Sequence, residues 1–272
     1  GLKVRALLPV HLYGHPCDMN PLMDLAREYG LAVVEDAAHA LPASHEGRKV
    51  GSFAKLFDVP VMTCFSFYAT KNLTTGEGGM LTGPTELIDE ARIWSLHGMS
   101  RDAWNRYGAK GSWFYEVVRP GFKYNLTDIA AALGLRQLRK LDAFQTRRVE
   151  IVRRYNEAFS QFEELTVPAE RPNVAHAWHL YVLRLNAGRL SITREQFIEE
   201  MRGRRIGTSV HFIPVHTHPY YRDRYGFGAE DFPVAAAEFR RIVSLPLNPR
   251  MSDRDVEDVI EAVGDVIEKF RR

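Results

Sequence analysis

The chain has little of what marks secreted, membrane or nucleic-acid-binding proteins. Its two cysteines, Cys17 and Cys64, lie in unrelated contexts, so neither a disulfide framework nor a cysteine metal site is predicted, and a reducing cytoplasm is expected. The longest nearly uncharged apolar stretch, residues 59–68, is too short to span a bilayer. The formal net charge is only +2, which gives no strong field for nucleic acid. What remains is an ordinary globular composition, 45% hydrophobic and 26% charged over 272 residues.

Several sequence motifs are also missing. No G-x-G-x-x-G follows a strand, and no Gly-Lys-Ser/Thr run opens a helix, which disfavours a nucleotide-binding dehydrogenase and a P-loop. The late histidines lack the cysteine or carboxylate spacing of a zinc site, so no metal is predicted. Among them, His211 ends a strand-like run over residues 208–212 and is the one expected to face a cleft.

The first part of the chain reads as a βαβ unit, which is typical of a parallel sheet. We expect a strand over residues 4–10, a helix over 21–29 that stops at Gly30, and a strand from 31 that ends at Glu35-Asp36. A further strand over 61–67 and a helix over 85–96 follow. Because ligands gather beyond the carboxyl ends of parallel strands, Asp36 and Lys71 are expected near a binding site.

The second half reads as a smaller α+β domain. Residues 101–120 form a long irregular stretch, which is usually functional or part of an interface. A long helical region over 127–162 carries many arginines, and we interpret these as a solvated helix face rather than a phosphate track. A polar connection over 170–175 precedes strands at 179–185 and 208–212 and helices at 193–202, 234–241 and 253–270. The predicted domain boundaries are 1–138 and 139–272.

Lys71 is the first candidate for chemistry. Phe65 and Phe67 precede it in a strand pattern, and three glycines follow within residues 76–79, where a backbone can approach a ligand closely. A lysine held among apolar residues can lose its proton, and the neutral amine attacks carbonyl groups. The alternative is an ordinary surface lysine.

Asp36, Ser66 and His39 are the accompanying candidates. Pyridoxal phosphate (PLP) needs an amine, a carboxylate for its pyridinium nitrogen and donors for its phosphate. A buried Asp36 would need a cation nearby, although a turn or helix-capping aspartate is also possible. Ser66 has an aromatic residue on each side, so its hydroxyl would bind either a phosphate or a backbone carbonyl. His39 lies three residues after Asp36 and could face the same ligand.

Four segments together resemble the sugar aminotransferases of the DegT/DnrJ/EryC1/StrS family. The similar segments are residues 35–40, residues 65–72 with 76–79, residues 121–129 and residues 210–216, and the resemblance covers essentially the whole chain. It implies the fold-type I PLP architecture, an α/β large domain with a mainly parallel sheet and a smaller α+β C-terminal domain. Within the family, residues 123–128 and 177–180 are most similar to UDP-4-amino-4-deoxy-L-arabinose aminotransferases.

The resemblance also implies a role for each candidate. Lys71 would be the catalytic residue, joined covalently to the cofactor and moving the proton during transamination. Asp36 would pair with the pyridinium, Ser66 would hold the phosphate, His39 would sit by the ring, and Asn125 would reach the cofactor of a second subunit. Substrate contacts are assigned to Lys123, Tyr124 and His211. Many relatives have Asn-Tyr-Arg at positions 123–125, which leaves open whether Lys123 or Asn125 contacts the neighbouring phosphate.

The implied activity is conversion of a nucleotide-linked 4-keto sugar to the 4-amino sugar. The implied amino donor is glutamate, giving 2-oxoglutarate, in a cytoplasmic homodimer that serves cell-surface polysaccharide or lipopolysaccharide synthesis. One alternative is a PLP-dependent sugar dehydratase of the same fold, but those relatives usually replace the lysine with histidine. The other alternative is a non-catalytic sensor or scaffold.

Family members carry roughly a hundred further residues ahead of the position that matches Gly1, judged by length against domain size. By resemblance, that segment supplies a helix N-terminus for the phosphate and an aromatic residue that stacks on the ring. We therefore expect the 272-residue chain alone to hold PLP weakly. A tight, lysine-linked PLP absorbance from this chain would contradict that expectation.

Overall fold

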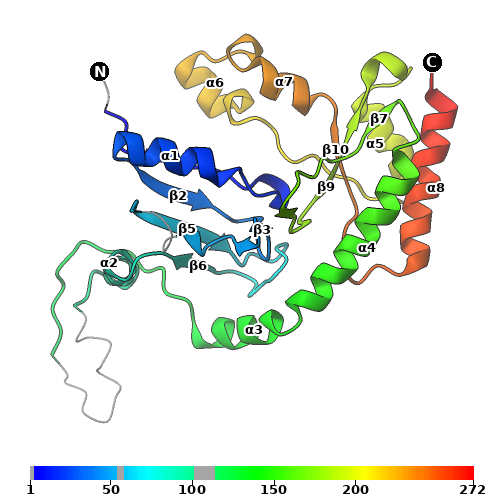
Figure 1. Ribbon diagram of the computed structural model, residues 1–272. Coiled ribbons are helices and arrows are strands. Elements are labelled where there is room, and N and C mark those ends of the chain that lie inside the picture. The colour runs from blue at the N-terminus through cyan, green and yellow to red at the C-terminus, as the bar shows by residue number, and fades with distance from the viewer. Residues whose placement is uncertain (1–2, 54–57, 101–113) are drawn as a thin grey trace. The chain divides into compact units, whose positions relative to one another are not determined.

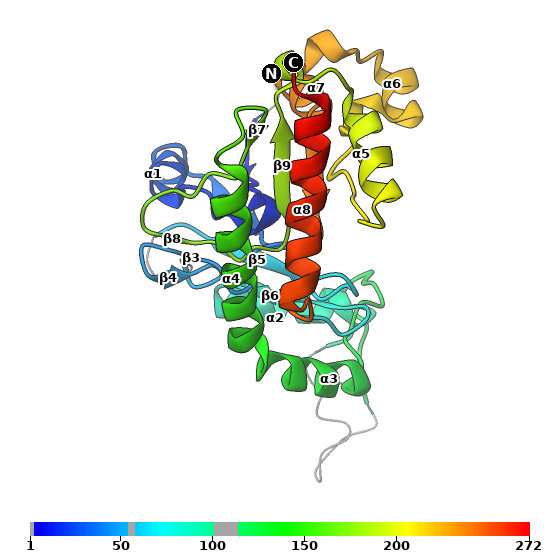
Figure 2. The same ribbon diagram turned by 90° about the vertical axis from the view of Figure 1, so that its right-hand side faces the viewer.

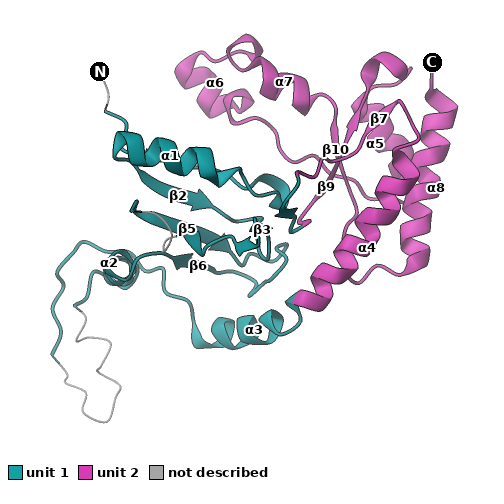
Figure 3. Ribbon diagram, in the orientation of Figure 1, with its two compact units in different colours: residues 1–141, 172–177 teal, residues 142–171, 178–272 magenta. Residues whose placement is uncertain are grey.

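The computed structural model describes residues 3–53, 58–100 and 114–272. The chain divides into two compact units (Figure 1, Figure 3). Unit 1 comprises residues 1–141 and 172–177, and unit 2 comprises residues 142–171 and 178–272. Unit 1 is therefore built from two separate stretches of the sequence.

The main sheet of unit 1 has four strands in the order β1-β2-β5-β6. The strands are β1 (Ala6–Leu7), β2 (Ala32–Asp36), β5 (Val61–Ser66) and β6 (Gly79–Thr82). The pairs β1–β2 and β2–β5 are parallel, whereas β6 is antiparallel to β5. The predicted βαβ unit and the mainly parallel sheet are confirmed.

Helix α1 (Met19–Tyr29) connects β1 to β2 and packs on one face of this sheet (Figure 1). Its buried side chains, Met19 and Met23 among them, form one core cluster with Val33 of β2 and Val61 of β5. The helix ends at Gly30, which has a φ of +62° and donates its N–H to the carbonyl of Ala26. A left-handed residue of this kind closes a helix with least strain when it is glycine, so the predicted stop is confirmed.

The strand expected over residues 4–10 is shorter than predicted. Only Ala6–Leu7 form β1, and a single parallel bridge joins Val10 to Asp36 further along. Pro9 lies between them, and it has no N–H with which to continue the ladder.

A second, small sheet in unit 1 has the order β4-β3-β8. It pairs β3 (Ser44–His45) with β4 (Arg48–Lys49) and with β8 (Val174–Ala175). Strand β8 lies where a polar connection was expected, and its partner is well over a hundred residues away in the sequence. This pairing brings residues 172–177 back to unit 1.

Unit 1 also contains α2 (Thr85–Ser95) and α3 (Asp128–Leu138) among its described residues, and the Thr127 side chain caps α3 by accepting the N–H of Ala130 at 3.3 Å. The long helical region expected over 127–162 is thus two helices, because α4 (Leu141–Phe159) begins separately. Within the irregular stretch, residues 101–113 lie outside the described residues; after them, Val117 bridges to Met99 and Lys123 to Leu96.

Unit 2 has a three-stranded antiparallel sheet in the order β10-β9-β7. Its elements are α4, β7 (Leu165–Thr166), β9 (Tyr181–Leu185), α5 (Arg194–Gly203), α6 (Pro219–Tyr225), α7 (Pro233–Phe239), β10 (Ile242–Leu245) and α8 (Asp253–Phe270). The prediction of a strand over residues 208–212 was wrong. This segment forms no strand and makes an isolated bridge between Ser209 and Ser244.

Helices α4 and α8 run alongside each other in unit 2 (Figure 2). Ion pairs join them: Arg147 Nη2 lies 2.8 Å from Asp253 Oδ1, and Arg154 lies 3.2 Å from Asp253 Oδ1 through Nη1 and 3.1 Å from Glu257 Oε1 through Nη2. These pairs fit the interpretation of the basic residues as a solvated helix face. Arg148 is different: it is buried and donates to the carbonyls of Trp178 and Leu247 at 2.9 and 3.1 Å, and burial lowers its pKa to about 10.

No helix among the described residues is both long enough and apolar enough to cross a membrane.

Candidate active site

Asp36 stands at the carboxyl end of β2, held by backbone bonds. Its N–H donates to the carbonyl of Pro9 at 2.9 Å, and its own carbonyl accepts the N–H of His11 at 3.0 Å. In its side chain, Oδ1 accepts the N–H of Ala38 at 3.0 Å. This bond fixes the orientation of the carboxylate, which is exposed and can receive a cation.

Lys71 lies in the loop between β5 and β6 rather than in a strand. The loop is closed at its base, since Phe67 N donates to Gly78 O at 2.8 Å and Thr75 N donates to Phe67 O at 2.9 Å. Within it, Lys71 N donates to Tyr68 O at 3.0 Å. The Lys71 side chain is half-buried, and these backbone hydrogen bonds hold its loop in place.

The charges of Lys71 and Asp36 act on each other. Burial lowers the pKa of Lys71, and the Asp36 carboxylate partly opposes that effect. The two groups therefore interact electrostatically. Cys64 is paired with Asp36 across the two strands. Burial and the carboxylates of Asp36 and Glu35 raise the pKa of the Cys64 thiol.

Ser66 and His39 lie on the same two segments as these residues. Ser66 ends β5, and its Oγ accepts the N–H of Tyr68 at 3.3 Å, so the hydroxyl proton can be donated to an anion. His39 follows Asp36, and its Nδ1 accepts the N–H of Tyr13 at 3.2 Å, which orients the ring. Because Nδ1 accepts, we assign the ring proton of neutral His39 to Nε2.

Lys123, Tyr124 and Asn125 lie together in unit 1. The Nζ of Lys123 donates to Oδ1 of Asn125 at 2.5 Å, and the Tyr124 ring stacks on Phe122 with centroids 5.0 Å apart. Tyr124 and Asn125 line a hollow of about 500 Å³ beside Gly78 and Gly79. Lys123 and Asn125 therefore form one polar pair next to the glycine-rich end of the lysine loop.

His211 belongs to unit 2. Its Nδ1 lies 2.8 Å from Oγ of Ser244, and its ring contacts that of Phe212 edge to face. Its assignment to the substrate stays a prediction.

A buried cluster of three polar side chains next to Asp36 was not predicted from the sequence. Glu35 and His11 are fully buried; Thr63 Oγ1 donates to Glu35 Oε2, and His11 Nε2 lies 3.7 Å from Glu35 Oε1. Burial lowers the pKa of His11, but Cys17 and Glu35 raise it, with a net rise to about 9. The three side chains join β2, β5 and the segment after β1. The signal in the sequence was an acidic residue directly before Asp36, on the opposite face of the strand.

The residues of unit 1 fit PLP by the chemistry of their side chains. Asp36 offers a carboxylate to a ring nitrogen, and Ser66 offers a hydroxyl donor to a phosphate. Lys71 offers an amine with a lowered pKa, which can react with an aldehyde. In the part of the chain that the structure describes, no cluster of histidine, cysteine or carboxylate side chains could hold a metal ion.

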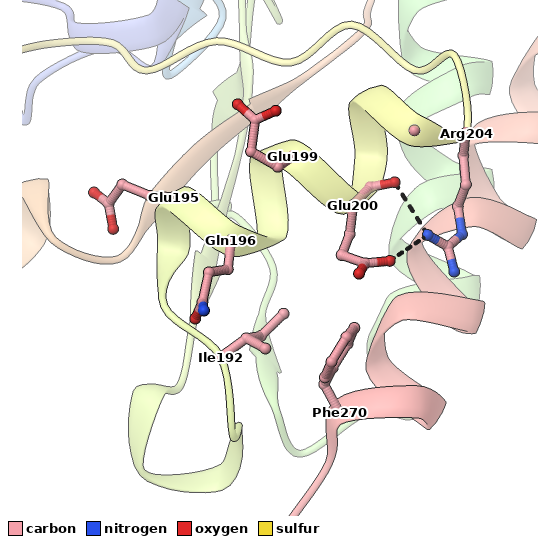
Figure 4. Close-up of a pocket in the computed structure, with 8 residues that line it drawn as sticks. Ile192, Glu195, Gln196, Glu199, Glu200, Arg204 and Phe270 are labelled. Carbon is pink, nitrogen blue, oxygen red and sulfur yellow. Dashed lines mark hydrogen bonds and ion pairs between the residues drawn. The ribbon is translucent and has the colours of Figure 1, made fainter.

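Another hollow, of about 690 Å³, lies in unit 2 between α5 and the end of α8 (Figure 4). Its carboxylates are already paired: Glu195 with Arg194, Glu199 with Arg202, and Glu200 with Arg204 at 2.8 Å. It contains none of the predicted site residues, and we assign no ligand to it.

Known proteins resemble this chain over nearly its whole length. The spore coat polysaccharide biosynthesis protein SpsC of Bacillus subtilis is 51% identical over 267 residues, which are 97% of this chain and 67% of SpsC. Spr1654 of Streptococcus pneumoniae, solved in a PMP form and a PLP form, is 33% identical with a TM-score of 0.85 for the PMP form. That match covers 97% of this chain and 70% of Spr1654.

Helicobacter pylori PseC, an aminotransferase involved in the biosynthesis of pseudoaminic acid, is 25% identical with a TM-score of 0.85. The match covers 98% of this chain and 67% of PseC. The structural neighbours have the fold-type I architecture that the motifs implied. A family model matches residues 2–264, and the chain therefore belongs to the DegT/DnrJ/EryC1/StrS aminotransferase family.

Proposed function

We propose that this protein is a PLP-dependent aminotransferase that converts a nucleotide-linked 4-keto sugar to the 4-amino sugar, with glutamate as the amino donor. The observation that carries the proposal is a half-buried Lys71, whose pKa is lowered by burial, on a loop that follows β5, with the carboxylate of Asp36 at the end of the adjacent strand β2 acting on it electrostatically. An amine that is easily deprotonated and a fixed anion are the two groups that PLP chemistry requires from a protein.

Each residue has a distinct task in this proposal. When bound, the cofactor supplies an electron sink for the carbon that loses a proton. Lys71 Nζ would hold the aldehyde of the cofactor, and its free amine would carry the proton. The Asp36 carboxylate would keep the ring nitrogen protonated, and Ser66 Oγ–H would donate to the phosphate. His39, whose ring is oriented by Tyr13 N, would contact the bound cofactor.

A sugar substrate is supported by the relatives, because SpsC serves polysaccharide synthesis. The nucleotide and the 4-keto position follow from the sequence resemblance. We assign Lys123, Tyr124 and His211 to substrate binding and place the product in cell-surface polysaccharide or lipopolysaccharide synthesis. Cys17 and Cys64 are free thiols, which is consistent with a cytoplasmic enzyme.

We also propose a homodimer whose subunits share their active sites. Large apolar side chains are exposed around the hollow beside Asn125, including Tyr124, 74% exposed, and Ile129, 86% exposed. Exposed apolar groups of this kind, gathered together, mark interaction surfaces. A second subunit covering this surface would receive the Lys123–Asn125 pair near its cofactor phosphate.

The function is tested by loading the protein with PLP and adding glutamate. We expect the absorbance of the PLP form to give way to that of the PMP form, and a subsequent UDP- or dTDP-linked 4-keto sugar to restore it with formation of an amino sugar. Cofactor binding without conversion by glutamate would indicate a sensor or scaffold. Loss of a sugar hydroxyl without amination would indicate a dehydratase.

Subunit mixing tests the shared site. We expect Lys71→Ala and Asn125→Ala proteins to be inactive alone, and a mixture dissociated and reassembled to recover about a quarter of wild-type turnover. The reason is that half of the reassembled dimers are mixed, and each has one site with both residues intact. A mixture that stays inactive although mass spectrometry shows mixed dimers would place Asn125 in its own subunit's site.

A further inference from the structure

The residue after Lys71 carries a buried amide that the proposed chemistry does not use. Asn72 is 8% exposed, and its Nδ2 donates to the carbonyl of Leu41 at 3.1 Å and to the carbonyl of Ala177 at 2.7 Å. Carbonyl groups only accept hydrogen bonds, so the geometry fixes which end of the amide faces them. Both amide protons are therefore committed to the backbone of other segments.

The first partner belongs to the segment that carries Asp36 and His39. This segment follows β2 and is a compact series of turns, since Ala40 N donates to Ala37 O at 2.9 Å and Ala43 N donates to Ala40 O. Leu41 lies within these turns. The bond from Asn72 thus joins the lysine loop to the turns that follow the carboxylate.

The second partner is the last residue of the returning stretch 172–177. Ala177 N donates to Gly14 O at 2.9 Å, and the neighbouring Tyr13 N orients His39 through its Nδ1. The amide of Asn72 is therefore the point where the segments of Lys71, of His39 and of residues 172–177 meet.

The lysine loop is fixed on both sides of its reactive residue. Leu73 is buried in a small apolar cluster with Phe67 and Leu141, and Lys71 N bonds to Tyr68 O. Leu41 of the Asp36 segment packs against this cluster as well, and the Asn72 amide adds a directional hydrogen bond to the same residue. Because adjacent Cα atoms are about 3.8 Å apart, holding residue 72 in place also limits where the side chain of residue 71 can begin.

We propose that Asn72 is a positioning residue, whose amide holds the lysine loop against the Asp36 segment and so sets the separation of the amine from the carboxylate. The proposal rests on the proposed function, in which Lys71 is the amine that binds the cofactor. Asn72 itself touches neither substrate nor cofactor in this role.

The test measures the titration of Lys71 in the protein without added cofactor. Trace acetic anhydride labels neutral amines, and mass spectrometry of the peptide that contains Lys71 gives a midpoint from its pH dependence. In the wild type we expect a midpoint below the ordinary 10.5. In Asn72→Ala the loosened loop exposes the amine and moves it away from Asp36; because burial is the larger of the two effects on its pKa, we expect the midpoint to rise by at least about half a pH unit, a roughly threefold loss of neutral amine at fixed pH. Asn72→Ser, which retains one donor, should give an intermediate shift.

A second measurement uses PLP as the probe. Borohydride traps cofactor that is joined to lysine, and we expect the ratio of trapped to total bound PLP to fall about tenfold in Asn72→Ala, since a misplaced amine loses effective concentration. The control is Val59→Ala, which opens the core under α1 and lowers the melting temperature without touching the lysine loop. It should leave the midpoint and the ratio unchanged.

The proposal is overturned if Asn72→Ala, or Asn72→Ser where the alanine variant does not fold, keeps the wild-type midpoint. It is also overturned if Val59→Ala shifts the midpoint as much, because general loosening then explains the effect. A wild-type protein in which Lys71 traps no PLP even at saturating cofactor would contradict the proposed function instead, and the titration midpoints would still decide the role of Asn72.

Discussion

Replacement of Lys71 by alanine is expected to lower turnover at least about 10⁴-fold and to abolish the lysine-linked cofactor absorbance. The side chain is the half-buried amine opposite Asp36, and alanine offers neither a nucleophile nor a proton carrier. Turnover is measured with glutamate and the 4-keto sugar that the substrate panel identifies. Covalent attachment is measured by borohydride trapping and mass spectrometry.

Two control variants separate the loss of the reactive amine from the loss of a positive charge and from the general effect of replacing a lysine. Lys49→Ala removes an exposed lysine of the same unit, whose Nζ donates to Pro42 O at 3.2 Å, and it should keep wild-type turnover. Lys71→Arg retains the positive charge but not an amine that deprotonates, so it should be as inactive as the alanine variant. Turnover above about a hundredth of wild type in Lys71→Ala would remove Lys71 from its role.

Replacement of Asp36 by asparagine is expected to lower turnover roughly a thousandfold and to weaken PLP binding. Asparagine keeps an oxygen that can accept the N–H of Ala38, so the turn after β2 is preserved while the charge is lost. Without that charge the ring nitrogen is less readily protonated, and the cofactor becomes a poorer electron sink. Turnover and a PLP titration followed by absorbance measure the two effects.

The matched control is Asp24→Asn. Asp24 is an exposed carboxylate on α1 that pairs with Arg27 at 3.0 Å, so its loss should change neither quantity measurably. If Asp36→Asn turned over substrate as fast as wild type, the carboxylate would not be the partner of the ring nitrogen.

The parts of the fold that could be predicted are those determined by local patterns. The final helix has the predicted bounds, Asp253–Phe270, because Ser252 caps it in a capping box and its apolar residues repeat regularly. Gly30 ends α1 as expected. The placement of Asp36 at a parallel strand end also followed from the βαβ pattern.

The parts that could not be predicted depend on distant residues. Strand β8 forms only because β3 pairs with it, and nothing in its polar, proline-containing surroundings indicates a strand. The helical pattern over residues 127–162 contains no proline, so the interruption at Arg139-Lys140 left no local mark. Asn72 stood in a recognised motif, but its two partners lie 31 and 105 positions away.

The return of residues 172–177 to unit 1 has a practical consequence for dissecting the protein. A fragment cut once, after Leu141, would lack the outer strand of the small sheet and one of the two carbonyls that receive the Asn72 amide. The half that holds the reactive amine cannot be obtained as a simple N-terminal piece. A fragment that contains all of unit 1 would need a short linker between residue 141 and residue 172, so that one polypeptide contains both stretches.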